Sequence, residues 1–214
     1  MEFKNIIEKL LADPIKIRLF SVLSQNRGGL SGRALGVLCS TSSFKIQQVV
    51  RELVAQGVLT ESIAGRSHLY RLNLSHILVQ EVIHPLLQFE GNLLKQLGAK
   101  ILKSLNPKPL AVIIYGSVAR GEETAQSDID LLLIDPEKGK LPNPAPFAER
   151  IVRAYGNFAS FKRMTVNELR EKVRQKDPLI RNVVKEGRSL AGLPLMEVLD
   201  YGRQKDKHHH SSQE

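Results

Sequence analysis

Two aspartates and a glycine–serine pair are the residues of this sequence whose types and spacing are best suited to chemistry. Gly116 and Ser117 follow an apolar run, and ten residues separate Ser117 from Asp128. Asp130 comes two positions after Asp128 and leads directly into the apolar run 131–134. Because side chains alternate along a strand, the two aspartates are expected on one face, with α-carbons roughly 7 Å apart. Two carboxylates placed in this way predict a site for Mg²⁺ or Mn²⁺.

The glycine–serine pair is suited to holding phosphate. Backbone N–H groups at the start of a short helical turn and the Ser117 hydroxyl can bind phosphate oxygens, and Gly116 allows the backbone to approach closely. A divalent cation commonly bridges carboxylates to substrate phosphates, so the two pairs together predict nucleoside triphosphate chemistry. The alternative is that Asp128 caps a turn and Asp130 lies at a strand edge. An unpaired carboxylate beside a core strand is costly, which favours the functional interpretation.

Two neighbouring residues are further candidates for nucleotide binding. Arg120 is close enough in sequence to reach a β- or γ-phosphate, and a solvated loop arginine is an equal alternative. Ser127 could hydrogen-bond an aspartate, although capping of a turn is the simpler interpretation.

Apolar runs and amphipathic segments alternate in the second half of the chain. Strands are expected over 110–115, 129–134 and 158–164, and helices over 146–155, 166–174 and 179–187. Thr165 and Glu168 have the spacing of a capping box at the start of one of these helices. The pattern predicts an α/β domain over 106–195, with a boundary near Asn106 and a flexible tail over 196–214.

The segment GSVARGEETAQSDID resembles the signature of the DNA polymerase β-type nucleotidyltransferase superfamily, and most closely its minimal nucleotidyltransferase branch. The resemblance covers about residues 106–195 and implies a mixed sheet flanked by helices. It also implies transfer of a nucleotidyl group, AMP from ATP being the expected case, to an unidentified hydroxyl with Mg²⁺ or Mn²⁺. By matching, Gly116 and Ser117 would contact the triphosphate, while Asp128 and Asp130 would bind metal and carry catalysis. Members of this branch often act as antitoxins that nucleotidylate a toxin, so a toxin-like protein is an expected acceptor by analogy.

The sequence departs from the family pattern at one position. Family members usually carry a third carboxylate on the next core strand, and here that position falls at or near Ser160, in a stretch without an acid. Asp135 lies at the far end of its own strand and cannot replace it. Loss of a metal ligand and base could cost a factor on the order of 10² to 10⁴ in rate. The alternative to an enzyme is therefore a regulator or antitoxin that binds nucleotide with weak turnover or none.

The first 73 residues predict three helices followed by a hairpin. The helices are expected from Pro14 to about Asn26, over 31–39 and over 43–56, with two strands over 58–73 joined by a tip at 64–67. This pattern resembles the winged helix-turn-helix of transcriptional regulators, so the expected architecture is two domains of α+β and α/β type.

Charge favours double-stranded DNA as a partner of this first domain. Residues 1–73 hold 10 Lys and Arg against 5 Asp and Glu, which is +5 of a total net charge of +9. The expected DNA contacts come from the third helix and the wing: Ser43, Lys45, Gln47, Gln48, Arg51, Arg66 and His68. The alternative is a protein-interaction module whose polar face is solvated.

Residues 74–105 predict a helical linker that Pro85 kinks or splits. An apolar ridge along it must face the other domain or the same helix of a second subunit, so a homodimer is expected. The only cysteine, Cys39, excludes an intrachain disulfide and favours a reducing, cytoplasmic location. No apolar run reaches bilayer-spanning length, so no membrane association is expected.

Overall fold

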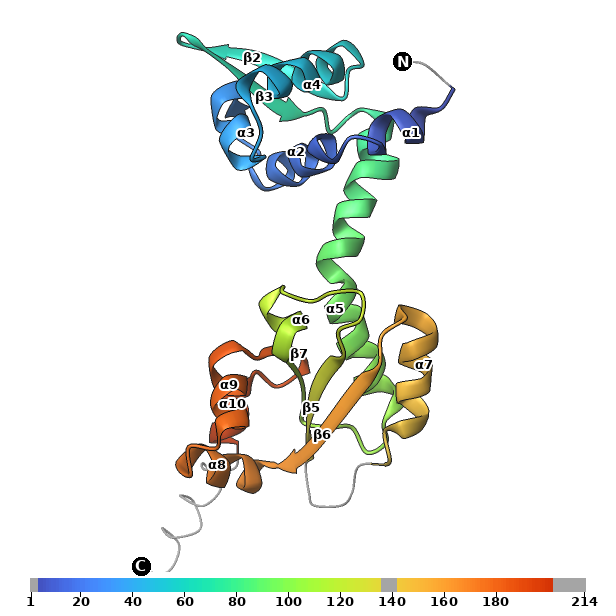
Figure 1. The fold of residues 1–214 in the computed structure, drawn as a ribbon, viewed down its shortest axis with the longest axis vertical. Coiled ribbons are helices and arrows are strands. Elements are labelled where there is room, and N and C mark those ends of the chain that lie inside the picture. Colours follow the sequence, from blue (N-terminus) through green and yellow to red (C-terminus); the bar gives the residue numbers. More distant parts are fainter. Residues whose placement is uncertain (1–3, 136–141, 202–214) are drawn as a thin grey trace, which may run out of the picture. The chain divides into compact units, whose positions relative to one another are not determined.

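The computed structural model describes residues 4–135 and 142–201, which form two units with separate cores. The N-terminal unit is 1–91 and the C-terminal unit is 92–214. The division falls inside one long helix, α5 (His84–Ser104), rather than near Asn106 (Figure 1). The reason is packing, because α5 contributes Leu97 and Ile101 to the core of the C-terminal unit.

The N-terminal unit contains the three helices and the hairpin that the sequence predicts. Its elements are α1 (Ile6–Leu11), α2 (Pro14–Gln25), β1 (Leu30–Ser31), α3 (Gly32–Leu38), α4 (Ser43–Ala55), β2 (Leu59–Ala64) and β3 (Ser67–Leu72). Two of these, α1 and β1, were not expected. Helix α1 buries only Leu10, and β1 is two residues long, so neither has a pattern long enough to read in the sequence. The three strands form one antiparallel sheet in the order β1-β3-β2.

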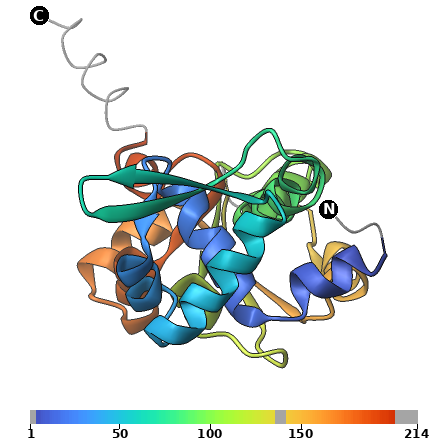
Figure 2. The same cartoon turned by 90° about the horizontal axis from the view of Figure 1, so that it is seen from above.

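Side-chain caps begin the main helices of the N-terminal unit. The carboxylate of Asp13 accepts a hydrogen bond from the Ile15 N–H at 2.9 Å, and Ser31 and Ser42 cap α3 and α4 in the same way. Gly65, with φ +59°, forms the tip of the β2–β3 hairpin. The hairpin tip projects past the helices of this unit (Figures 1 and 2). Cys39 is fully buried in the core, which fits a small structural side chain.

The interruption predicted at Pro85 takes the form of a π-helical turn, η1 (Val79–Ile83), which leads directly into α5. Proline cannot donate a hydrogen bond to the preceding turn, and a wider turn relieves the clash of its ring. The apolar ridge predicted along α5 is buried in one part of the helix and exposed in another. Leu97 and Ile101 are buried, whereas Leu86 and Phe89 are 43% and 56% exposed.

The C-terminal unit is a mixed sheet covered by helices on both faces, as the resemblance implies. Its elements after α5 are β4 (Ala111–Tyr115), α6 (Gly116–Arg120), β5 (Ile129–Asp135), α7 (Ala145–Tyr155), β6 (Ala159–Thr165), α8 (Val166–Arg174), α9 (Pro178–Glu186), β7 (Arg188–Gly192) and α10 (Leu195–Asp200). The strand order is β6-β5-β4-β7, with β5 and β6 parallel and the other pairs antiparallel. The predicted capping box of Thr165 and Glu168 is present at the start of α8.

Alternation along β5 sends side chains to two cores. Leu131 and Leu133 pack with α5 and α7 on one face, and Leu132 and Ile134 pack with α8, α9 and α10 on the other. Figure 1 shows α7 on one side of this sheet and α8 to α10 on the other.

Strand β7 and helix α10 were not expected from the sequence. Helix α10 buries Val198 completely, so the prediction of a flexible tail from residue 196 is wrong as far as residue 201. The remainder of that tail lies outside the described residues. Within residues 4–135 and 142–201, no helix is long and apolar enough to cross a membrane.

Candidate functional site

The end of β4 and the start of β5 bring the predicted nucleotide residues together. Strand β4 runs directly into α6, so Gly116 and Ser117 lie at the turn where the strand becomes helix. In the antiparallel pairing of the two strands, Tyr115 is opposite Asp130. Register therefore places Asp130 beside Gly116, although fourteen positions separate them in the chain.

Gly116 is required by both conformation and space. Its φ is +74°, a region that favours glycine, and a Cβ at this position would lie 2.6 Å from Asp130 Oδ2. The carboxylate therefore lies against the backbone at the start of α6. The neighbour found here is a carboxylate of the chain itself, whereas the sequence predicted an approach of the Gly116 backbone to phosphate, which stays a prediction.

Asp128 and Asp130 interact electrostatically. Burial is the main cause that raises the pKa of Asp130 above its ordinary value, the charge of Asp128 raises it further, and Lys162 opposes both effects. Asp128 itself is exposed. Two carboxylates that repel each other, one of them against a glycine that leaves room, fit a divalent cation.

The loop between α6 and β5 is braced by hydrogen bonds of Ser127 and Asn157. The Ser127 hydroxyl accepts the Thr124 N–H at 2.9 Å, so the capping role that was the simpler interpretation of Ser127 is present in the structure. Asn157 Nδ2 donates to the carbonyl oxygens of Ala125 and Ser127 at 3.2 and 3.0 Å. Asn157 follows α7 and is remote in sequence, so only the fold reveals that it holds the segment leading to Asp128.

Arg120 lies in a network of acids rather than alone in solvent. Its guanidinium donates to Glu122 at 2.7 Å and to Glu186 of α9 at 3.1 Å. These contacts, that with Glu122 first, raise the pKa of Arg120 further above its ordinary value. Arg120 would have to exchange a carboxylate for a phosphate oxygen in order to bind nucleotide.

The position at which the family pattern expects a third acid lies beside the aspartate pair. In the parallel pairing of β5 and β6, Ser160 is directly opposite Asp130. Asp135 lies at the other end of β5, where it pairs with Arg163 at 2.8 Å. Among the described residues, no group of three His, Cys, Asp or Glu side chains is placed to hold a metal ion.

The predicted DNA-contacting residues of α4 differ in what surrounds them. Ser43, Gln48 and Arg51 are exposed. Gln47 is half-buried and its amide packs against Gly32 of α3, so it is less available than the sequence analysis expected. Phe44 is 83% exposed in the first turn of α4, and the sequence analysis did not single it out. Only its exposure in the structure singles Phe44 out, because a sequence pattern predicts that an aromatic residue at this position lies in the core.

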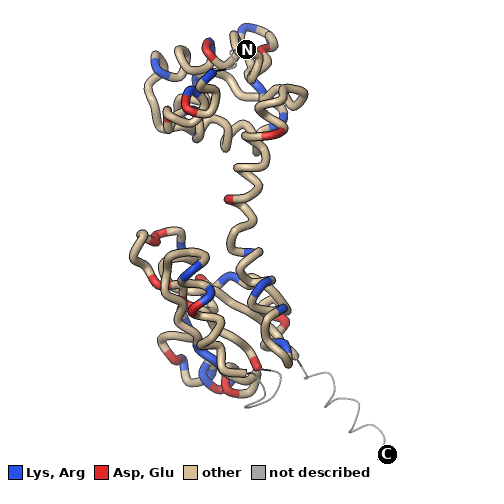
Figure 3. The backbone as a smooth tube through the Cα atoms, turned by 90° about the vertical axis from the view of Figure 1, so that its right-hand side faces the viewer, with Lys and Arg blue, Asp and Glu red and all other residues tan. Residues whose placement is uncertain are grey.

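The wing carries the other two predicted DNA contacts. Arg66 is exposed at the hairpin tip, and His68 Nδ1 lies 2.8 Å from Glu61 Oε1 on the neighbouring strand. Basic and acidic positions are interspersed along the backbone of the N-terminal unit (Figure 3). The excess of basic residues is therefore spread over several elements.

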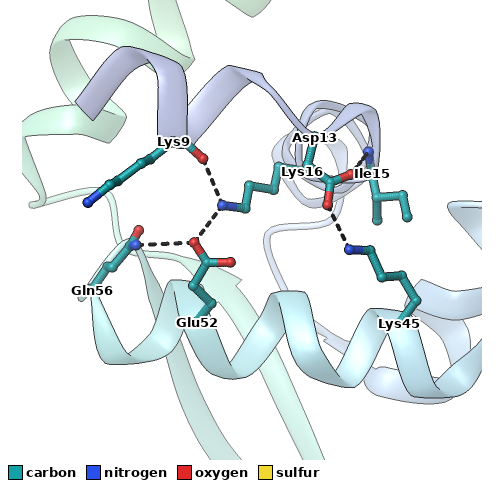
Figure 4. A network of polar contacts seen from close by, with 7 residues as sticks. All are labelled: Lys9, Asp13, Ile15, Lys16, Lys45, Glu52 and Gln56. Atoms are coloured by element: carbon teal, nitrogen blue, oxygen red, sulfur yellow. Dashed lines mark hydrogen bonds and ion pairs between the residues drawn. The ribbon is translucent and has the colours of Figure 1, made fainter. Parts of the chain in front are cut away.

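A polar network ties α4 to the helices before it (Figure 4). Lys16 is 6% exposed, and its ammonium group donates to the Lys9 carbonyl at 2.7 Å and to Glu52 Oε1 at 2.6 Å. At the other end of α4, Lys45 pairs with Asp13 at 3.1 Å. Residues around the start of α2 therefore hold both ends of α4 in place.

Residues 99–192 match the family model described as polymerase beta, nucleotidyltransferase. This match confirms, for that segment, the resemblance identified from the glycine–serine and aspartate motif. No match is found among curated proteins.

Several solved structures are similar to parts of this chain. One is a toxin–antitoxin crystallised with AMP-PNP, at 17% identity and a TM-score of 0.37, covering 55% of this chain and 90% of that one. A second is the tri-AMPylated HEPN toxin of Shewanella oneidensis with its MNT antitoxin, at 18% identity and a TM-score of 0.33, covering 56% and 87%. A third is described as the predicted DNA-binding transcriptional regulator from E. coli, at 16% identity and a TM-score of 0.34, covering 41% and 84%.

Proposed function

We propose, from the polymerase β-type nucleotidyltransferase domain at residues 99–192, that this protein transfers a nucleotidyl group from a nucleoside triphosphate to a hydroxyl group. The observation that carries the proposal is the contact of Asp130 with the glycine turn, because a Cβ at Gly116 would lie 2.6 Å from the carboxylate. That contact would bring bound phosphate next to a bound divalent cation.

The roles of the residues follow from their positions. Ser117 and the N–H groups at the start of α6 would bind oxygens of the triphosphate. Asp128 and Asp130 would hold Mg²⁺ or Mn²⁺, which when bound offsets the negative charge of the phosphates. Asn157 and Ser127 would keep Asp128 in position by bracing the loop before it. The donor is proposed to be ATP, and a hydroxyl on a toxin-like protein is the proposed acceptor.

Transfer of label from α-labelled ATP tests this function. Purified protein is incubated with the labelled nucleotide, Mg²⁺ and cell lysate, and labelled macromolecules are detected after separation. Transfer that depends on Mg²⁺ and is lost in both Asp128→Ala and Asp130→Ala supports the proposal. Lys108→Ala is the control, because Lys108 is exposed and precedes β4 at the end of the sheet opposite Gly116. Transfer that persists in both aspartate variants would overturn the assignment.

A second function, binding of double-stranded DNA, is favoured by the N-terminal unit. A capped helix with exposed Ser43, Gln48 and Arg51 lies beside a hairpin with exposed Arg66, in a segment of net charge +5. We propose that DNA binding locates or regulates the enzyme, with a dimer spanning two half-sites. A gel-shift titration in rising salt tests it, since phosphate contacts make affinity fall with salt concentration.

The alternative within the same site is a nucleotide-sensing regulator or antitoxin without turnover. The observation in its favour is Ser160 opposite Asp130, where the family pattern expects an acid. Binding of ATP with Mg²⁺, but no transfer of label to any acceptor, would favour this alternative.

A further inference from the structure

The face of β6 that borders the aspartate pair carries a serine and a lysine instead of acids. The parallel register pairs Asp130 with Ser160 and Leu132 with Lys162. Because alternate residues of paired strands share a face, both β6 side chains lie on the same side of the sheet as Asp130. Ser160 and Lys162 are both exposed, so each is available to whatever binds there.

Lys162 is a near neighbour of Asp130 across the parallel pair of strands. It lies two residues beyond Ser160, the direct partner of Asp130, and on the same face of the sheet. With Asp128, Asp130 and Lys162 charged, the three side chains sum to one negative charge. A third carboxylate in place of the serine and no lysine would bring the sum to three negative charges, which would attract divalent cations more strongly.

The ammonium group of lysine is also a suitable partner for phosphate. It is a compact point charge with three donors on a long flexible stem, and it binds phosphate oxygens in many nucleotide sites. At Lys162 the stem starts on the edge strand β6, on the face of the sheet that carries Asp130.

We infer that Lys162 replaces the second divalent cation of a two-metal nucleotide site, so that this protein binds one divalent cation with each nucleoside triphosphate. The inference rests on the proposed nucleotide binding and deepens it. It identifies Lys162 as a residue that sets the metal requirement and selects triphosphate over monophosphate.

Counting Mn²⁺ bound with a non-hydrolysable ATP analogue tests the inference without measuring activity. The full chain is brought to equilibrium by dialysis against saturating Mn²⁺ and the analogue, and both are quantified in the protein compartment. The expected ratio is one Mn²⁺ to one analogue in the wild type. The double variant Ser160→Asp with Lys162→Gln is expected to bind two. A ratio of two in the wild type, or of one in the double variant, would overturn the inference.

The single variant Lys162→Gln separates phosphate binding from metal number. Its affinity for the triphosphate analogue is expected to fall about tenfold, the change that one lost charge-assisted contact produces, while its affinity for AMP stays unchanged. The matched control is Lys108→Gln, an exposed lysine beyond the other end of the sheet, for which no change is expected. Equal affinity of Lys162→Gln and the wild type for the analogue would overturn the inference.

Failure of the proposed function gives a different result from failure of the inference. If the wild type does not bind the analogue, or if binding is the same in Asp128→Ala and Asp130→Ala, nucleotide binding at this site is wrong and the inference falls with it. If the analogue binds and depends on the aspartates, but with two Mn²⁺, only the role of Lys162 is wrong.

Discussion

Gly116 and Asp130 lie so close together that the missing Cβ of Gly116 would stand 2.6 Å from Asp130 Oδ2. The substitution Gly116→Ala should therefore displace the carboxylate and strain a backbone with φ +74°. The strain is worth on the order of 1–3 kcal/mol of stability. We expect affinity for ATP in the presence of Mg²⁺ to fall about tenfold or more, measured by calorimetry.

Gly156→Ala is the matched control for strain alone. Gly156 ends α7 with φ +79°, and a Cβ added there would meet no other atom within 4 Å. A similar loss of stability with unchanged nucleotide affinity is expected. Equal effects of the two substitutions on affinity would contradict the role assigned to the contact with Asp130.

The raised pKa of Asp130 makes stability depend on pH in a defined direction. Burial and Asp128 place the folded pKa above the unfolded value of 3.8, so the folded chain binds this proton more tightly. Stability should then fall as pH rises from 3.8 through the folded pKa. In the absence of metal, Asp130→Asn should have a higher melting temperature than the wild type at pH 7, and the difference should shrink as pH is lowered through that window.

Adding Mg²⁺ with ATP at pH 7 should give the wild type a higher melting temperature than Asp130→Asn, the reverse of the order without metal. The wild type is expected to be stabilised by the bound ligand, whereas Asp130→Asn is not. A difference in melting temperature that is the same at every pH would show that charge is not its cause.

Asn157→Ala tests whether the loop before Asp128 must be held. The substitution removes two hydrogen bonds, to the carbonyl oxygens of Ala125 and Ser127, with a cost of about 1–2 kcal/mol in stability. Nucleotide affinity should fall several-fold because Asp128 loses its fixed position. The control is Asn143→Ala, which removes one comparable bond at the start of α7, where Asn143 Oδ1 accepts the Ala145 N–H at 3.0 Å. Weakened binding in the control would contradict a specific role for Asn157.

Two lysines of the N-terminal unit pair with acids, and removal of their charge should reduce the stability of the protein by different amounts. Lys16→Met breaks two bonds of a buried ammonium group, so we expect about 1–3 kcal/mol of lost stability by chemical unfolding. Lys45→Met removes a partly exposed pair with Asp13, and its cost should stay below about 1 kcal/mol.

For DNA binding we expect the opposite order: Lys45→Met should have the larger effect and Lys16→Met the smaller one. In gel shifts, the slope of the logarithm of DNA affinity against the logarithm of salt concentration should be smaller in magnitude by about one in Lys45→Met, because one phosphate contact is lost. Lys16→Met, assayed where it is folded, should leave that slope unchanged. An unchanged slope in Lys45→Met would remove Lys45 from the proposed interface.

Local patterns in the sequence predicted most elements of both units. Pro14 after Asp13, the capping box at Thr165, and the apolar runs around 110–115 and 129–134 each act within one turn or one strand. The elements that were missed have weak local signals. Strand β7 gains its hydrogen bonds from β4, and α10 is held by burial of Leu195 and Val198 under the sheet.

Residue types and short-range spacing alone determined which groups could bind phosphate and metal, because a motif such as Gly116, Ser117, Asp128 and Asp130 is contained in one short stretch of the chain. Only the tertiary structure decided what these groups touch. The register of β5 against β4 and β6 brings Gly116, Ser160 and Lys162 to the aspartates, and the fold turns Gln47 toward α3. Such contacts join residues far apart in the chain, and they follow from strand pairing and the filling of a shared core, which no local pattern encodes.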